Sequence, residues 1–342
     1  MKTYSRPRVA IVGATGAVGS TMLSILEERN FPATDVRLMA SSRSAGKIIG
    51  PRWGDVEVED LETADPVGVD IALFSAGGAR SKEYAPQFVG AGATVIDNSS
   101  AFRMVDDVPL VVANVNDDAI AENQGIIANP NCTTMTIMMA AGPLHRAAGM
   151  RTMIATSYQS VSGSGKTGMD QLQSEVEHFM GNLDGLVSGG WEDPGGDLYA
   201  RPIAYNVLPL AGSITDVGYT DEEWKLVNET RKILRRESIA VEPTCVRVPV
   251  MVGHGIAASM WFDRAVDLDE AVAVLGGAPG VQLWDDTNVP TPLDSVGIDD
   301  VLIGRLRETV GHLGGISLFA IGDNLRKGAA LNAVELAELL LV

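Results

Sequence analysis

A glycine-rich turn close to the start of the chain is the feature that most constrains its fold. Residues 8–12 form a short apolar run, and the segment Gly13-Ala-Thr-Gly-Ala-Val-Gly19 separates this run from a helical pattern that begins near Met22. The order predicts a strand, a tight turn and a helix. Glycines at such a turn let the backbone approach a pyrophosphate at the helix N-terminus, so the segment predicts a dinucleotide site. A tight strand–helix turn without a ligand is the alternative.

Short apolar runs continue this alternation through about the first 130 residues. They lie at 36–40, 69–74, 94–97 and 110–113. Strand-like runs that alternate with helix-like or turn segments are typical of a parallel sheet built from βαβ units. The predicted fold class is therefore α/β, with an N-terminal Rossmann-type domain.

After residue 150 the pattern changes, and a Gly/Pro-rich loop spans residues 182–213. The predicted strands are 151–161, 245–252 and 254–262, and the predicted helices are 132–147, 165–181 and 220–236. These elements indicate a second, α+β domain with a mixed sheet. The segment 324–342 predicts a closing helix. We expect residues 1–130, completed by 324–342, to form the first domain and residues 131–323 the second.

The charge balance excludes several classes of function. The chain has 26 basic and 44 acidic residues among 342, a formal net charge of −18, and no long basic run. Nucleic-acid binding needs clustered Lys and Arg, so we expect no nucleic-acid partner. No apolar stretch reaches the ~18 residues of a membrane span, and the N-terminus leads into a strand without a secretory segment. We therefore expect a cytoplasmic protein with no membrane partner.

Cysteine and histidine are scarce in this chain. Cys132 and Cys245 are the two cysteines, and there are four histidines. Two cysteines cannot make a disulfide framework, and the spacing of a metal cluster is absent. We expect no metal site.

The end of the second predicted strand bears on the choice of cofactor. NAD-binding versions of this fold place a carboxylate there for the ribose 2′-hydroxyl, but this chain continues Ser41-Ser-Arg-Ser-Ala-Gly-Lys47. Arg43 with hydroxyl groups on both sides suits a 2′-phosphate, which needs a cation and neutral donors. The segment therefore favours NADP over NAD. A solvated turn is the alternative.

Cys132 follows an apolar strand pattern and the turn Asn129-Pro-Asn131, and it opens a helix rich in Met and Ala. The free N–H groups and the dipole at a helix N-terminus stabilise a thiolate, so we expect this sulfur to be nucleophilic near neutral pH. A small buried hydrophobic residue is the alternative.

His254 is the best placed of the histidines to serve as a base. His145 and His178 lie within predicted helices and His312 lies in a loop, whereas His254 follows a glycine between two predicted strands. In the first of those strands Arg247 lies on the face opposite Val246 and Val248. An embedded arginine is a candidate carboxylate clamp, with a structural salt bridge as the alternative.

Together the motifs resemble the aspartate-β-semialdehyde dehydrogenase family along nearly the whole chain. The matching segments, in order, are Gly13–Gly19, Ser41–Gly46, Phe74–Gly78, Ile96–Arg103, Asn129–Thr134, Tyr158–Gly165, Tyr205–Pro209, Cys245–His254 and Asp323–Asn332. The resemblance implies NADPH-dependent reductive dephosphorylation of β-aspartyl phosphate to aspartate semialdehyde, with release of phosphate, in the biosynthesis of lysine, threonine and methionine. It also implies a homodimer or homotetramer joined through the second domain.

The resemblance assigns roles by matching motif. Cys132 would form the acyl-thioester, Gln159 would orient the substrate, and His254 would be the acid/base. Arg247 would bind the substrate α-carboxylate and Glu222 its α-ammonium, while Arg103 and Lys225 would hold the phosphate. The implied cofactor contacts are Gly13, Thr15, Gly16, Ala17, Val18, Ser41, Arg43, Ser44, Ser162, Gly163 and Asn324. For Glu222 and Lys225 the alternative is a solvated helix face, and for Arg103 an ordinary surface cation.

Two residues depart from the family pattern, since Gly255 stands where serine is common and Glu335 where glutamine is common. N-acetyl-γ-glutamyl-phosphate reductase, which acts on a substrate one methylene longer, is the nearest alternative enzyme. Arg247 and the Glu222/Lys225 pair favour the aspartyl substrate. A nucleotide-binding relative that has lost turnover is the alternative from a different class.

Overall fold

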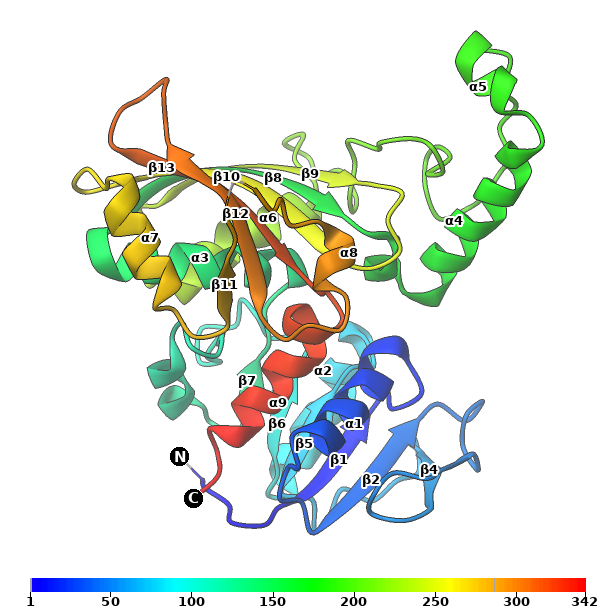
Figure 1. The fold of residues 1–342 in the computed structure, drawn as a ribbon. Coiled ribbons are helices and arrows are strands. Elements are labelled where there is room, and N and C mark those ends of the chain that lie inside the picture. Colours follow the sequence, from blue (N-terminus) through cyan, green and yellow to red (C-terminus); the bar gives the residue numbers. More distant parts are fainter. Residues whose placement is uncertain (1, 286) are drawn as a thin grey trace.

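Two β-sheets, each covered by helices, stack one above the other in the view of Figure 1. The structure is a computed structural model that describes residues 2–285 and 287–342. The first sheet has the order β3-β4-β2-β1-β5-β6-β7. Its strands are β1 (Arg8–Val12), β2 (Asp35–Ala40), β3 (Ile48–Ile49), β4 (Val56–Asp60), β5 (Ile71–Phe74), β6 (Thr94–Asp97) and β7 (Ile126–Ala128). All neighbours are parallel except β3 and β4, which confirms the predicted Rossmann-type sheet.

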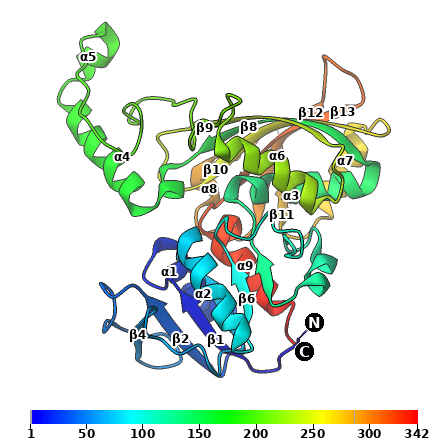
Figure 2. The same ribbon diagram turned by 180° about the vertical axis from the view of Figure 1, so that it is seen from behind.

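The second sheet is mixed, as predicted, and has the order β11-β12-β13-β10-β8-β9. Its strands are β8 (Met150–Gln159), β9 (Ala240–Arg247), β10 (His254–Phe262), β11 (Val281–Leu283), β12 (Val301–Glu308) and β13 (Gly315–Gly322). Strand β8 runs parallel to β9 and antiparallel to β10. Helices α3 (Cys132–Ala148), α6 (Asp221–Ile233) and α7 (Leu268–Gly276) share one core with this sheet and lie on its lower face in Figure 2.

The remaining helices complete the two layers and form one projection. Three helices pack on the first sheet: α1 (Ala17–Glu28), α2 (Gly78–Gly90) and α9 (Leu331–Glu338). The short helix α8 (Pro292–Ser295) contacts β13 of the second sheet. Short 3₁₀ turns occupy Asp117–Glu122 and Val161–Ser164. Helices α4 (Gly165–Met180) and α5 (Leu183–Ser188) extend away from both sheets in Figure 1.

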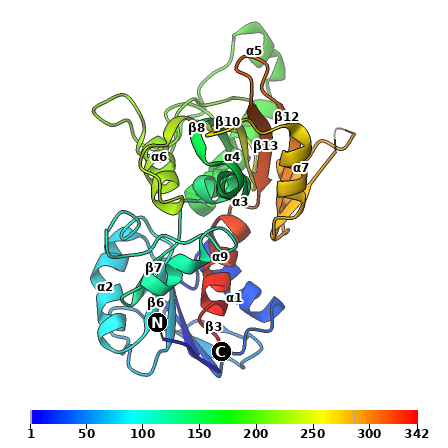
Figure 3. The ribbon, with the colours of Figure 1, turned by 90° about the vertical axis from the view of Figure 1, so that its left-hand side faces the viewer.

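The C-terminal segment returns to the first sheet. A π-helical turn (Arg326–Ala330) precedes α9, which packs against α1, β5 and β6. Leu331, Val334 and Leu336 are buried in the same core as β1 and α1. Tyr4 pairs with Leu341, and Figure 3 shows the two ends of the chain close together. The predicted closing helix thus covers the N-terminal sheet.

Two predicted strands differ from the structure. Residues 110–113 make only a single bridge, from Leu110 to Ala128, because the amides of Asn116 and Asn332 bind the backbone that a strand would pair. Strand β9 spans Ala240–Arg247 where 245–252 was predicted, so it both begins and ends earlier along the chain. Pro249 has no N–H to donate to a neighbouring strand, and the backbone turns there, with the Val250 N–H bonded to the Val248 carbonyl.

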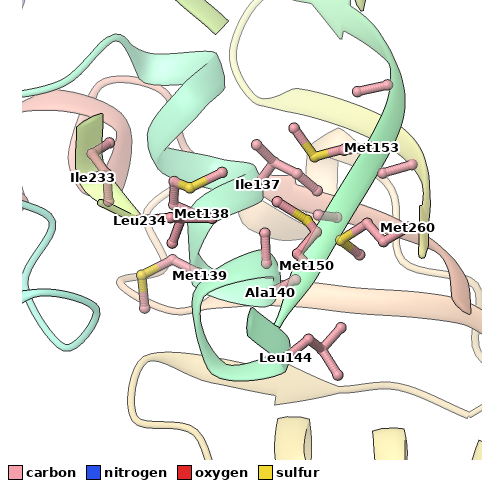
Figure 4. Close-up of a cluster of buried hydrophobic side chains, with 14 of the residues drawn as sticks. Ile137, Met138, Met139, Ala140, Leu144, Met150, Met153, Ile233, Leu234 and Met260 are labelled. Atoms are coloured by element: carbon pink, nitrogen blue, oxygen red, sulfur yellow. The ribbon is translucent and has the colours of Figure 1, made fainter. Parts of the chain in front are cut away.

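Helix α3 is the best-buried helix of the second layer. Figure 4 shows Ile137 of this helix close to Met153 of the sheet, and Met138 on the other side of the helix close to Leu234. Unbranched methionines fill irregular gaps in a core. This packing fixes the axis of α3, and the first residue of the helix is Cys132.

Candidate active site

A cavity of about 300 Å³ lies where α3, α6 and the ends of both sheets meet. The predicted residues on its wall are Val18, Arg103, Cys132, Gln159, Ser162, Gly163, Glu222, Lys225, Arg247, His254 and Asn324. They come from segments far apart in sequence, and the structure brings them to one pocket.

Cys132 is placed by the cap of α3. The Asn131 side-chain oxygen accepts hydrogen bonds from the backbone N–H groups of Thr133 (2.9 Å) and Thr134 (3.4 Å). Asparagine is a favoured cap because this bond satisfies N–H groups that have no partner within the helix. Cys132 therefore occupies the first helical position, as predicted, and its Sγ lies 3.2 Å from Nε2 of His254.

His254 begins β10 and is fully buried. Its Nδ1 lies 3.1 Å from both the amide nitrogen and the hydroxyl oxygen of Ser160. The amide can only donate, whereas the hydroxyl can also accept. The backbone N–H of Ser160, which the sequence analysis missed, therefore donates to an unprotonated Nδ1, and only the hydroxyl can accept from Nδ1 when that atom carries a proton.

Two environmental effects act on the Cys132 thiol in opposite directions. Burial, with Glu222 close by, raises the pKa of Cys132 to about 11. Burial and the Arg247 guanidinium lower the pKa of His254 to about 3. Both shifts favour the neutral thiol and the neutral imidazole, whereas the helix N-terminus favours the thiolate. A thiolate near neutral pH stays a prediction.

Gln159 and Glu222 form a polar network beneath the sulfur. The Gln159 amide donates to Glu222 (3.1 Å) and to the Thr133 hydroxyl, and the Asn131 amide also donates to Glu222 (2.9 Å). Burial would raise the pKa of Glu222, but Lys225 and these donors hold it below its ordinary value. Lys225 lies 3.0 Å from Glu222. The pair lines the cavity and is not a solvated helix face.

Arg247 lies at the end of β9 with its side chain in the cavity wall. Its Nη1 donates to the Ser160 carbonyl (2.8 Å), and its Nε is buried without a hydrogen-bond partner among the described residues. A Cβ at Gly163 would lie 2.9 Å from Nη1, so glycine keeps this approach open. No carboxylate of the described chain pairs with Arg247, which argues against the structural salt bridge.

Arg103 is buried and is held at three points. It donates to the carbonyls of Asn129 (2.9 Å) and Asn98 (3.0 Å) and to the Glu229 carboxylate (3.0 Å). It is therefore not an ordinary surface cation. Glu229, which the sequence analysis did not select, also accepts a hydrogen bond from the backbone N–H of Asn131 (2.7 Å).

The glycine turn borders a second cavity, of about 170 Å³. The predicted cofactor residues on its wall are Gly13, Thr15, Gly16 and Ser41. Gly13 has φ +93°, and a Cβ there would lie 2.3 Å from the Ser75 carbonyl oxygen. No side chain in the described part of the chain caps α1, so the amides of its first turn, which starts at Ala17, remain available to a phosphate. A close backbone turn before an uncapped helix fits a dinucleotide.

The region predicted to hold the 2′-phosphate lies beside this cavity. The Thr15 hydroxyl donates to the Ser44 hydroxyl (3.1 Å), which joins the turn to the segment after β2. Arg43 is exposed, and its side chain has no hydrogen bond or ion pair with the described residues. Arg80, a further cation that the sequence analysis missed, lines the same cavity from α2.

The two departures from the family pattern have local explanations. A Cβ at Gly255 would lie 2.7 Å from the Phe319 ring, so a serine there would require that ring to move. Glu335 accepts a 2.6 Å bond from the buried Lys327, although burial raises the pKa of this glutamate. Glu335 thus supplies the counter-charge for a buried lysine next to the π-helical turn.

Two negative findings concern residues 2–285 and 287–342. No group of three His, Cys, Asp or Glu side chains in them could hold a metal ion. No helix in these ranges has the length and apolar character needed to cross a membrane.

Comparisons with known proteins point to one family. The model described as "Semialdehyde dehydrogenase, NAD binding domain" matches residues 8–123, and "Semialdehyde dehydrogenase, dimerisation domain" matches residues 142–327. The aspartate-semialdehyde dehydrogenase of Corynebacterium glutamicum is 52% identical over 97% of this chain and 98% of its own length. That of Streptomyces akiyoshiensis is 51% identical, with the same coverage. The crystal structure of aspartate semialdehyde dehydrogenase II from Vibrio cholerae, complexed with ASA, is 44% identical, with a TM-score of 0.91 over 98% of each chain.

Because burial raises the pKa of Cys132, its alkylation in the free protein should depend steeply on pH. We expect the rate with iodoacetamide to rise roughly tenfold per pH unit between about pH 7 and 10, as the thiolate fraction grows toward the pKa. Peptide mass spectrometry after timed quenching measures this rate, with the buried Cys245 as the internal control. A rate that levels off below about pH 8 would show a stabilised thiolate instead.

Proposed function

This chain belongs to the aspartate-semialdehyde dehydrogenase family, and on that premise we propose that it reduces β-aspartyl phosphate to aspartate semialdehyde with NADPH, through a thioester on Cys132. It is an oxidoreductase of amino-acid biosynthesis that uses a nicotinamide cofactor. The 3.2 Å contact between Cys132 Sγ and His254 Nε2, inside a cavity lined by cations, carries the proposal.

The charges around the cavity suit a substrate that carries a carboxylate, a phosphate and one ammonium group. Arg247 offers an unpartnered Nε to the substrate α-carboxylate, and an arginine fork matches a carboxylate geometrically. Glu222, held ionised, would take the α-ammonium. Arg103 and Lys225 would bind the phosphate. Gln159 has a buried carbonyl oxygen without a partner among the described residues, which is free to orient the substrate.

The thiol proton must leave before Cys132 can attack. Nε2 of His254 is the acceptor within reach, and the Ser160 hydroxyl would then accept from Nδ1. Attack of the sulfur on the acyl carbon forms a C–S bond and breaks the bond to the phosphate oxygen, and phosphate leaves. The bound cofactor supplies the hydride that reduces the thioester. His254 returns its proton as the thiolate departs. Amides at the start of α3 would stabilise the oxyanion.

We further propose NADP as the cofactor, because no carboxylate follows β2 and Arg43 is free to meet a 2′-phosphate. Val18, Ser162, Gly163 and Asn324 line the Cys132 cavity and would hold the nicotinamide end. The division into residues 1–130 with 324–342, and 131–323, is supported by the packing of α9 on the first sheet.

A homodimer joined through the second domain is supported by the dimerisation-domain match. The N-acetyl-γ-glutamyl-phosphate reductase alternative is disfavoured by Glu222 and Lys225, which shape the cavity for a free amino acid, and by the relatives described above.

The reverse reaction tests the proposed function directly. Purified protein with aspartate semialdehyde, phosphate and NADP should produce NADPH, measured by its absorbance. Cys132→Ser should abolish turnover but keep cofactor binding, because a hydroxyl is far less acidic and far less nucleophilic than a thiol. Cys245→Ala should lose some packing stability and keep the activity. Normal turnover by Cys132→Ser would contradict the thioester route.

Arg43→Glu should weaken NADPH binding by about tenfold or more, since it replaces a phosphate partner by a repelling charge. NADH binding should change much less, so that the preference for NADPH over NADH becomes smaller or reverses. Fluorescence titration of both cofactors against wild type and variant measures this. Equal weakening of both cofactors would place Arg43 outside the ribose site.

A further inference from the structure

One face of α6 alternates acidic and basic side chains at helical spacing. Glu222, Lys225, Glu229 and Lys232 are separated by three, four and three residues, so they lie on one stripe of the helix. The first two line the cavity. The Lys232 ammonium donates to the carbonyls of Arg103 (2.8 Å) and Val105 (2.7 Å). The stripe therefore continues from the cavity to the segment that carries Arg103.

Glu229 joins two parts of the site. It is 1% exposed, and its two oxygens accept from different partners. Oε1 accepts from Nη1 of Arg103 (3.0 Å), and Oε2 accepts from the amide of Asn131 (2.7 Å), the residue that caps α3 directly before Cys132. One carboxylate thus ties a cavity arginine to the backbone that holds the sulfur.

The bonds of Arg103 leave part of its guanidinium free. Its Nε and one N–H of each terminal nitrogen are taken by Asn129, Glu229 and Asn98. A guanidinium has five N–H donors, so one remains on each terminal nitrogen. Because the other three are fixed, the direction of the remaining two is set by the protein before any anion arrives.

We propose that Glu229 is a positioning residue. It holds the Arg103 guanidinium and the backbone amide of Asn131 in a fixed relative position, so that phosphate bound by Arg103 lies at a fixed place relative to Cys132. The proposal rests on the proposed function, in which Arg103 binds phosphate. Glu229 itself lines neither cavity.

The direction of the kinetic change separates positioning from simple charge balance. If Glu229 only neutralised Arg103, then Glu229→Gln would leave a stronger positive field and lower the KM for phosphate. If Glu229 positions Arg103, the glutamine loses one of two acceptor bonds, and the KM for phosphate rises. Glu229→Asp keeps the charge and shortens its reach, so charge balance predicts little change and positioning again predicts a rise.

The experiment measures KM for phosphate, aspartate semialdehyde and NADP in the reverse direction. Glu229→Gln and Glu229→Asp should each raise the phosphate KM about tenfold or more, from the loss of a charge-assisted hydrogen bond, with the NADP KM within about twofold. In an Arg103→Lys background the same changes should have little further effect, because the partner is gone.

Glu223→Gln is the matched control. Glu223 is also a buried carboxylate of α6, and it accepts from two backbone amides, those of Thr220 (2.7 Å) and Cys245 (2.9 Å). A glutamine there can keep the capping-box bond but loses the other acceptor bond, as a glutamine at residue 229 would. It should lower the unfolding temperature about as much as Glu229→Gln, without a selective change in phosphate KM.

Three results would overturn the proposal. They are an unchanged or lower phosphate KM in both Glu229 variants, effects that add fully to Arg103→Lys, and loss of folding in both variants while Glu223→Gln folds. Lack of wild-type turnover would instead contradict the proposed function. Phosphate binding is then read from protection of Cys132 against iodoacetamide, which the Glu229 variants should lose and Glu223→Gln should keep.

Discussion

The burial of α3 is the constraint on which the site depends. Its apolar residues, from Met135 to Leu144, are enclosed by the second sheet and α6, so the helix cannot shift along its axis without exposing core. Its N-terminus therefore lies at a fixed point between the two sheets. There the Asn131 cap orients the first turn, and His254, Gln159 and Glu229 reach that turn from β10, β8 and α6.

The cavity wall carries several cations although the chain as a whole is strongly acidic. The chain carries a net charge of −18, yet Arg103, Lys225 and Arg247 line the wall of one cavity. Each cation is held by hydrogen bonds to backbone carbonyls or to a carboxylate, so the position of each charge in the cavity wall is fixed. Burial also favours the neutral forms of Cys132 and His254 in the free protein.

The sequence predicted the parts that depend on local pattern. Strand β10 runs from His254 to Phe262 as predicted, because alternating apolar residues and the turn before it are local signals. Strand β9 was misplaced because Pro249 interrupts an apolar run that looked continuous. The burial that raises the pKa of the Cys132 thiol was not visible in the sequence, because it depends on residues distant in the chain. Glu229 was missed although its helical spacing from Glu222 and Lys225 was visible, since its partner Arg103 lies 126 residues away.

The thioester on Cys132 is the central claim, and trapping it is the most direct test. Thiol addition to the aldehyde followed by hydride loss to NADP gives a thioester and NADPH. Only phosphate then releases the acyl group from Cys132 at a useful rate. Wild-type protein mixed with aspartate semialdehyde and NADP, without phosphate, should show a burst of NADPH of about one per site and an aspartyl adduct on the 129–134 peptide by mass spectrometry. NADPH formed with no adduct on Cys132, or an adduct on Cys245, would contradict the account.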